Sequence, residues 1–365
     1  MTSRKSKRHT PNQATSIPRT SFQCEVDHLE GLENVVENEL LTRFDSKIDL
    51  TTTQRAGTLP FTLTGALQEL GTLQSVIAVY LVQEFSVPRP KALLGHQHFE
   101  TLIKHIERVR RLWPKGTFNT FYLNAAGRDS AILARLQEEI AKCTGLRNVS
   151  DEGDLLLRLR RSQDGWETLI RLSPRPLATR TWRVCNFPGA LNATVAHAMM
   201  QLTQPQPTDV VVNLACGSGT LLVERLNLEP VQHAIGCDID PVALTCAQEN
   251  LAAAGYADQV SLEQWDVGQL PLEDASVNVL CADLPYGQLI GSHQNNEHLY
   301  PRLFAEATRV AQPHARMALI THEVRLLEQI AATYQDFWHL EQVLRVRVSG
   351  MTPRCYFLRR KIDDM

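Results

Sequence analysis

Short apolar runs alternate with stretches of helical periodicity along the second half of the chain. Each run has the length of a buried strand, and the segments between the runs, beginning with 191–202, repeat apolar side chains every three to four positions. The expected strands are 210–214, 234–237, 260–262, 277–281 and 317–320. Repeated strand–helix units of this length predict an α/β fold with a doubly wound, Rossmann-like parallel sheet.

The end of the chain follows a different pattern. Residues 340–348 and 355–360 are rich in β-forming side chains and flank the tetrapeptide Gly-Met-Thr-Pro at 350–353. Two extended segments around such a turn predict a β-hairpin. We expect this hairpin to be antiparallel and to lie at the edge of the sheet, in a C-terminal domain that spans 176–365.

The first part of the chain predicts a smaller α+β module. Its apolar pattern reads strand, helix, strand, strand, helix, strand, which is the element order of a ferredoxin-like domain. The segments are 22–27, 32–40, 47–53, 57–64, 66–73 and 75–85. The module is placed at 21–88, and residues 87–90, Val-Pro-Arg-Pro, have the composition of a linker.

A third module is expected at 89–175. It contains an amphipathic helix at 99–113, a strand at 118–124, and a helix that runs to Lys142 with Gly145 just beyond it. Two strands, 154–161 and 166–172, then surround a Ser-Gln-Asp-Gly turn. Arginines alternate with leucines in this hairpin, so one of its faces is predicted to be basic.

Composition limits the classes of protein that fit. With 43% apolar and 21% charged residues the chain is expected to be globular, and no run approaches the roughly 18 apolar residues of a membrane span. Residues 1–20 are basic and polar, which predicts a disordered tail rather than a secretory signal. The eight cysteines form no C-x-x-C pair. That pattern predicts free thiols, a cytoplasmic location and no metal site.

Charge is distributed unevenly along the chain. The net charge is +5 for 1–20, −7 for 21–88, +8 for 89–183 and −9 for 184–365. A basic module joined to an acidic one is typical of proteins that hold nucleic-acid phosphates with one part and do chemistry with another, although solvated surface charge gives the same count. The candidate RNA-binding residues are Lys115, Arg158, Arg160, Arg161 and Arg171, with Arg175, Arg180 and Arg183 in the connector.

A glycine-rich turn follows the first strand of the expected parallel sheet. It reads Asn-Leu-Ala-Cys-Gly-Ser-Gly-Thr at 213–220, and Asp238, Asp266 and Asp283 end the next three strands. The carboxyl ends of parallel strands meet at one edge, where this class of sheet binds nucleotide-like ligands, and a carboxylate about 20 residues after the turn suits a ribose. The candidate cofactor-binding residues are Asn213, Ala215, Gly217, Gly219, Asp238, Ile239, Asp266 and Val267.

The tetrapeptide Asp283-Leu284-Pro285-Tyr286 makes the pattern more specific. Together with the glycine motif and the run GCDIDP, it resembles the class I methyltransferases that act on amino groups of nucleic-acid bases, although Leu284 stands where a proline is usual and Asn213 where an aspartate is common. The runs GLENVVENEL, LYPRLFAEATRV and VRVSGMTPRCYFLRRK resemble the THUMP-domain RNA methyltransferases that form N2-methylguanosine in tRNA. The resemblance covers about 22–361 and identifies 89–175 as a THUMP module.

This resemblance implies S-adenosylmethionine as cofactor, tRNA or another structured RNA as partner, and catalysis by Asp283, Leu284, Pro285 and Tyr286. The Asp283 carboxylate and the Leu284 carbonyl would accept the N–H protons of the target amine, and Tyr286 would stack on the base. Some relatives need a small activator protein, which this sequence does not identify. Three alternatives remain open: a ribosomal RNA guanine-N2 or adenine-N6 methyltransferase, a catalytically silent RNA-binding homologue, and an NAD-dependent oxidoreductase.

Overall fold

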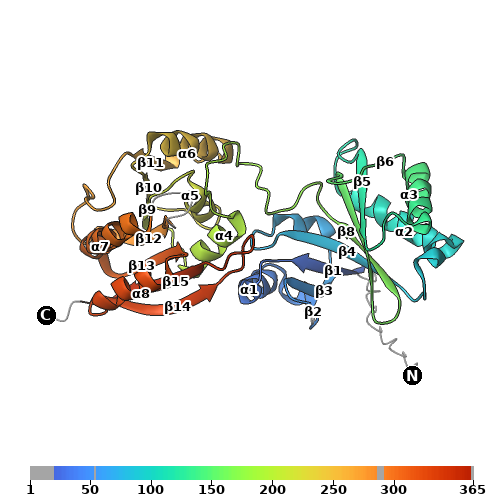
Figure 1. Ribbon diagram of the computed structural model, residues 1–365, viewed down its shortest axis with the longest axis horizontal. Coiled ribbons are helices and arrows are strands. Elements are labelled where there is room, and N and C mark those ends of the chain that lie inside the picture. Colours follow the sequence, from blue (N-terminus) through green and yellow to red (C-terminus); the bar gives the residue numbers. More distant parts are fainter. Residues whose placement is uncertain (1–19, 53–54, 286–291, 363–365) are drawn as a thin grey trace, which may run out of the picture.

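The molecule is elongated and consists of two parts, each built around one β-sheet (Figure 1). The computed structural model describes residues 20–52, 55–285 and 292–362. Most of the basic tail expected at 1–20, and the candidate catalytic residue Tyr286, lie outside these described residues. In the described part, no helix is both long and apolar enough to cross a membrane.

The N-terminal part contains a mixed sheet of eight strands in the order β2-β3-β1-β4-β8-β7-β5-β6. The strands are β1 (Ser21–Asp27), β2 (Ile48–Leu50), β3 (Thr58–Thr64), β4 (Ala78–Phe85), β5 (Thr120–Ala125), β6 (Arg147–Asn148), β7 (Leu155–Arg161) and β8 (Trp166–Arg171). The helices are α1 (Glu33–Phe44), α2 (His96–Arg110) and α3 (Ala131–Thr144), with 3-10 turns η1 (Asp45–Lys47), η2 (Leu67–Thr72) and η3 (Pro90–Leu94). The first four strands have the ferredoxin-like order, and η2 takes the place of the second helix that the sequence predicts.

Two strands join the ferredoxin-like strands to those of the expected THUMP module. β4 pairs antiparallel with β8 over six residues, from Tyr80 opposite Arg171 to Phe85 opposite Trp166. β8 in turn pairs antiparallel with β7, as the predicted hairpin requires. The strands of 21–88 and of 89–175 therefore share one hydrogen-bonded sheet.

The C-terminal part contains the predicted doubly wound sheet, in the order β11-β10-β9-β12-β13-β15-β14. The strands are β9 (Val210–Leu214), β10 (His233–Cys237), β11 (Val260–Glu263), β12 (Val277–Asp283), β13 (Ala311–Thr321), β14 (Trp338–Arg345) and β15 (Arg354–Arg360). The first five are parallel, whereas β14 and β15 form the predicted antiparallel hairpin. The helices are α4 (Ala193–Leu202), α5 (Thr220–Leu226), α6 (Pro241–Ala254), α7 (His293–Val310) and α8 (Val324–Thr333), with the 3-10 turn η4 (Ala257–Gln259).

The two parts are in close contact at the centre of the molecule, where the segment before α1 meets the end of β14 and the turn that follows it (Figure 1). The N–H of Arg347 donates to the carbonyl of Glu30 at 2.9 Å. Gly31 has a φ of +97°, and a Cβ at this position would lie 1.9 Å from the carbonyl oxygen of Arg345, so only glycine fits. One buried apolar cluster extends from the first sheet to α4 and β15. The interface therefore has a continuous core.

Candidate functional site

The glycine-rich turn between β9 and α5 has the backbone geometry that its sequence predicts. Ala215, Gly217 and Gly219 all have left-handed conformations, with φ of 50°, 54° and 76°. A Cβ at Gly217 would meet no atom within 4 Å, whereas one at Gly219 would lie 3.3 Å from the Cβ of Ala247. Gly217 therefore leaves room for a ligand, and Gly219 allows α5 and α6 to pack closely.

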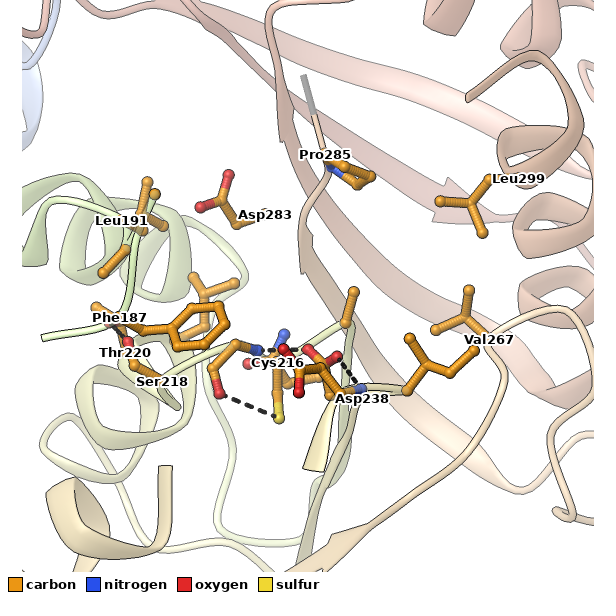
Figure 2. Close-up of a pocket in the computed structure, with 18 of the residues that line it drawn as sticks. Phe187, Leu191, Cys216, Ser218, Thr220, Asp238, Val267, Asp283, Pro285 and Leu299 are labelled. Atoms are coloured by element: carbon orange, nitrogen blue, oxygen red, sulfur yellow. Dashed lines mark hydrogen bonds between the residues drawn. The ribbon is translucent and has the colours of Figure 1, made fainter. Parts of the chain in front are cut away.

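Asp238 is held against this turn from the end of β10. Its Oδ2 accepts the N–H of Gly217 at 2.8 Å and its Oδ1 accepts the N–H of Asp240 at 3.0 Å, the two bonds drawn beside Asp238 in Figure 2. Ile239, which follows it, is 71% exposed. A carboxylate oriented by two backbone donors still has acceptor capacity, because each oxygen can accept more than one hydrogen bond.

Asp266 follows β11 and already has two partners. Its Oδ1 accepts the N–H of Gly268 at 2.8 Å, and its Oδ2 accepts from Nη2 of Arg302 at 2.7 Å. The backbone hydrogen bond from Gly268 and the guanidinium of Arg302 hold the pKa of the Asp266 carboxyl below its ordinary value. This residue stays ionised, and any ligand that it holds must share it with Arg302.

Asp283 ends β12, is half-buried, and lines a cavity that Asp238 and Asp266 also line. The next residue, Leu284, is 1% exposed and packs in the core, and its N–H donates to the carbonyl of Ile320 at 3.0 Å. A proline could not make this bond, because it has no N–H. Leu284 therefore extends the pairing of β12 with β13 by one bond that a proline at this position would lose.

A cavity of about 820 Å³ brings most of the predicted site residues together (Figure 2). The predicted residues that line it are Asn213, Ala215, Gly217, Asp238, Ile239, Asp266, Val267, Asp283 and Pro285. Gly219 and Leu284 are not among the lining residues, and Tyr286 is outside the described residues. In the part that the structure describes, no group of three His, Cys, Asp or Glu side chains could hold a metal ion.

The sequence did not reveal one wall of this cavity. Residues 187–191 of the connector, Phe-Pro-Gly-Ala-Leu, line it, and Phe187 and Leu191 are drawn in Figure 2. Nη2 of Arg183 donates to the carbonyl of Leu191 at 2.7 Å and to Oγ1 of Thr220 at 3.0 Å. Arg183 was predicted to bind RNA, but in the structure it closes this connector loop onto the glycine-rich turn. The segment has no periodicity, and its only signal is the Phe-Pro-Gly triplet.

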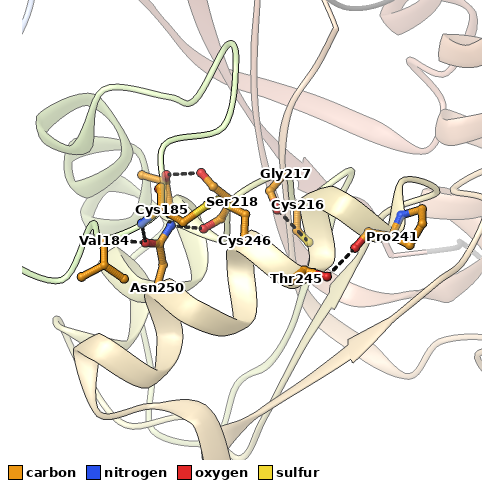
Figure 3. The surroundings of a disulfide bond; sticks show 10 residues. Val184, Cys185, Cys216, Gly217, Ser218, Pro241, Thr245, Cys246 and Asn250 are labelled. Atoms are coloured by element: carbon orange, nitrogen blue, oxygen red, sulfur yellow. Dashed lines mark hydrogen bonds between the residues drawn. A yellow bond between two sulfur atoms is a disulfide. The ribbon is translucent and has the colours of Figure 1, made fainter.

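A disulfide between Cys185 and Cys246 fastens the start of this wall to α6 (Figure 3). The expectation that all the cysteines are free thiols was therefore wrong for this pair. The two residues are 61 positions apart in the sequence, and only the fold brings their Cα atoms to 5.4 Å. Asn250 reinforces the attachment, since its Oδ1 accepts the N–H groups of Val184 and Cys185 and its Nδ2 donates to the carbonyl of Ser218.

Two arginines of the predicted basic hairpin, Arg158 and Arg160, have acidic partners within the protein. Arg158 donates to Asp27 at 2.6 Å and lies over the ring of Tyr80. Arg160 binds Glu25 through two nitrogens, at 2.8 and 2.5 Å, and also binds Glu167. The acidic excess of 21–88 and the basic excess of 89–183 thus partly neutralise each other across the shared sheet, so this hairpin face is not the free basic surface that the sequence predicts.

The remaining RNA-binding candidates divide into two groups. Arg171 and Arg180 are 8% and 9% exposed, and both are engaged inside the protein. Arg171 donates to the carbonyls of Ser173 and Pro174, and such buried groups cannot reach a phosphate without leaving their partners. The side chains that are exposed and could meet RNA are those of Lys115, Arg161 and Arg175.

Comparisons of the sequence with known proteins agree with this geometry. The family model of the RMKL-like methyltransferase domain matches residues 180–353. The tRNA (guanine(6)-N(2))-methyltransferase THUMP3 of Mus musculus is 30% identical over 185 residues, which are 47% of this chain and 37% of the mouse protein. The tRNA (guanine(6)-N2)-methyltransferase of Thermus thermophilus is 27% identical over 192 residues, which are 52% of this chain and 56% of that protein. The matched part therefore spans about a third to a half of these relatives.

Solved structures share the fold over almost the whole chain. TrmN from Thermus thermophilus superposes with a TM-score of 0.72 and 20% identity, covering 93% of this chain and 99% of that one. SMU.472, in a structure complexed with SAH, gives a TM-score of 0.66 and 14% identity, covering 94% and 99%. At these identities the likeness establishes the architecture, including the N-terminal mixed sheet.

Proposed function

We propose that this chain transfers a methyl group from S-adenosylmethionine to the exocyclic N2 amine of a guanine in tRNA, a proposal supported by the match of residues 180–353 to the RMKL-like methyltransferase domain and by the similarity to tRNA guanine-N2 methyltransferases. The observation that carries the proposal is the single cavity that Asp283, Gly217 and Asp238 line together. A cofactor cradle and an acceptor for amine protons thus lie at one sheet edge, as transfer between two bound molecules requires.

The residues that line the cavity fit the cofactor. Asn213 is 1% exposed, and no described residue forms a hydrogen bond with its Oδ1. This oxygen would accept a hydrogen bond from the ammonium group of the cofactor's methionine moiety. Asp238 would accept the ribose hydroxyls, while Ile239 and Val267 would contact the adenine and Asp266 its amino group. When bound, the cofactor supplies an electrophilic sulfonium methyl.

The protein's own task is to make the amine nucleophilic and to align it. The lone pair of an exocyclic amine is delocalised into the base, and acceptors for its N–H protons localise that lone pair. The Asp283 carboxylate and the Leu284 carbonyl are suited to this role, because both belong to the end of a strand that the sheet holds in place. Tyr286 would stack on the base, a contact worth about 1–3 kcal/mol. A guanine within a stem would have to be flipped out.

Recognition of the RNA is proposed for residues 89–175 and for the connector. The exposed residues Lys115, Arg161 and Arg175 are the candidates for phosphate contacts. RNA helices are recognised mainly by shape, phosphate and 2′-hydroxyl contacts, which suits a module separate from the cofactor cavity. A cytoplasmic location and a small activator protein remain proposals.

The deciding experiment incubates the protein and S-adenosylmethionine with unmodified tRNA and, separately, with unmodified ribosomal RNA, and analyses the nucleosides of each by mass spectrometry. We expect N2-methylguanosine. N6-methyladenosine, or methylation of ribosomal RNA alone, would replace the proposed substrate by one of its alternatives. Binding of tRNA without any product would indicate a silent homologue, and binding of NADH in place of S-adenosylmethionine would indicate an oxidoreductase.

A further inference from the structure

The carbonyl oxygen of Pro285 accepts two hydrogen bonds from α7. Nδ2 of Asn296 donates to it at 2.8 Å and the hydroxyl of Tyr300 donates to it at 3.0 Å. Asn296 and Tyr300 are four residues apart and therefore lie on one face of the helix. Both have a relative exposure of 0%. One turn of a buried helix face thus holds one backbone oxygen of the proposed catalytic tetrapeptide.

These contacts continue into β13 as a chain with a defined direction. The Tyr300 hydroxyl lies 2.8 Å from Oγ1 of Thr321, which accepts the N–H of Glu323 at 2.9 Å. Because a carbonyl oxygen can only accept, the single proton of the Tyr300 hydroxyl must point to Pro285, so Thr321 donates to Tyr300. The order is Glu323 to Thr321 to Tyr300 to Pro285. Each bond in such a chain polarises the next.

The end of the described segment is therefore anchored on both sides of the Leu284–Pro285 peptide bond. Before this bond, the Leu284 N–H is held by the Ile320 carbonyl, and after it, the Pro285 carbonyl is held by α7. The group between the anchors is the Leu284 carbonyl, which the proposed mechanism assigns to the target amine. Fixing both ends of this short segment limits how far that carbonyl can rotate.

We propose that Tyr300 and Asn296 are positioning residues for methyl transfer, which act by holding the Pro285 carbonyl so that the Leu284 carbonyl and the Asp283 carboxylate stay directed at the target base. This inference rests on the proposed function. Neither residue is required to touch the RNA. Loss of their hydrogen bonds therefore slows the transfer step and leaves the affinities for cofactor and RNA unchanged.

The test compares Tyr300→Phe with Tyr356→Phe. Tyr356 is a matched control, because it is 1% exposed, belongs to the same core cluster, and donates its hydroxyl to Glu328 at 3.1 Å instead of to the tetrapeptide. At saturating S-adenosylmethionine and tRNA, we expect Tyr300→Phe to lower the single-turnover rate about tenfold. Tyr356→Phe should stay within about twofold of the unmodified protein, and the Kd values for both ligands should be unchanged in both variants. Equal rates for the two variants would overturn the proposal.

Asn296→Asp provides a second, independent probe. The carboxylate cannot donate to the Pro285 carbonyl but has nearly the size of the amide, so the rate should fall by a factor similar to that of Tyr300→Phe. The double variant should lose more than the product of the two single losses, because each single change leaves one donor in place. A double variant that is no slower than the slower single variant would contradict a shared role.

Hydrogen exchange separates this proposal from the proposed function. The amide of Leu284 should exchange faster in Tyr300→Phe than in Tyr356→Phe, whether or not the protein methylates RNA. If the unmodified protein made no methylated nucleoside, the proposed function would fail, and this exchange rate alone would decide the positioning role. Unchanged exchange at Leu284 would overturn it.

Discussion

The guanidinium of Arg180 donates to the carboxylate of Glu224 at 2.8 Å, and the two side chains are 6% and 0% exposed. The same guanidinium donates to the carbonyl of Gln74 in the N-terminal part. His197 approaches the other oxygen of Glu224 at 3.1 Å. Arg180 therefore links the connector, the N-terminal part and α5 through one buried charge.

Removing this buried charge should destabilise the protein severely. We expect Arg180→Ala to lower the free energy of unfolding by about 3–5 kcal/mol, because it leaves the buried side chain of Glu224 without its main partner. Denaturant unfolding followed by circular dichroism measures the loss. Arg175→Ala removes an exposed arginine of the same connector and should cost less than about 0.5 kcal/mol. A stable Arg180→Ala protein that fails to bind tRNA would instead favour an RNA contact.

Asp238 should be the main determinant of cofactor affinity. We expect Asp238→Ala to weaken S-adenosylmethionine binding at least tenfold, about 1.4 kcal/mol, because the ribose loses a charged acceptor and Gly217 loses its partner. Isothermal titration calorimetry measures the Kd. Asp240→Ala is the control: Asp240 caps α6 through Val242, so its removal should lower stability by about 1 kcal/mol and leave the Kd within about threefold.

Asp283→Ala should abolish methyl transfer and leave the affinity for tRNA nearly unchanged, since this carboxylate acts on the reacting amine. Turnover should fall well below a tenth of normal, a loss of more than about 1.4 kcal/mol in transition-state stabilisation. Asp283→Asn keeps one acceptor oxygen and should retain more activity than the alanine variant. Quantitative methylation assays decide the point. If the alanine variant kept more than a tenth of normal turnover, another group would have to localise the lone pair.

The exposed basic residues should contribute to RNA binding in a salt-dependent way. We expect the triple variant Lys115→Glu, Arg161→Glu and Arg175→Glu to bind tRNA more weakly, with a slope of log Kd against log salt that is shallower by about one for each phosphate that is no longer neutralised. Fluorescence anisotropy at several salt concentrations measures both the affinity and the slope. Arg325→Glu reverses an exposed charge on α8 and serves as the control. Equal effects of the two changes would place the RNA elsewhere.

The Cys185–Cys246 disulfide should stabilise the fold more than it affects the cofactor cavity. It closes a loop with a sequence separation of 61 residues, for which the chain-entropy model gives about 4 kcal/mol. Reduction, or Cys246→Ser, should lower the free energy of unfolding accordingly. Binding of S-adenosylmethionine should stay within about threefold, because Asn250 still holds residues 184–185. A complete loss of binding on reduction would mean that the wall depends on the disulfide.

Much of the architecture could be predicted from local pattern. The five parallel strands are short apolar runs, and the positions of Asp238, Asp266 and Asp283 at their ends follow from the rule that ligands bind at the carboxyl edge. The structure brings these three carboxylates to one cavity. This part of the site is readable because each residue's place depends only on where its own strand ends.

The parts that could not be predicted depend on contacts between distant segments. The basic residues of β7 alternate visibly in the sequence. However, Arg158 binds Asp27, which is 131 residues away in the chain, and Arg160 binds Glu25, which is 135 residues away. The net charge of each segment shows that one is acidic and the other basic, but it does not show that their side chains form ion pairs with each other. The same applies to the Cys185–Cys246 pair and to the cavity wall at 187–191, which no periodic signal marks.

The pairing of β4 with β8 has a mechanical consequence. A hinge motion between the two N-terminal modules would have to break the β4–β8 hydrogen bonds from Tyr80 to Phe85. The two modules therefore move as one rigid unit. The buried apolar cluster between the two parts and the hydrogen bond from Arg180 to Gln74 attach this unit to the C-terminal sheet. An RNA bound to this rigid unit would then lie at a fixed distance from Asp283. The target nucleotide would then be selected by its distance from the RNA-binding surface rather than by the identity of the neighbouring bases.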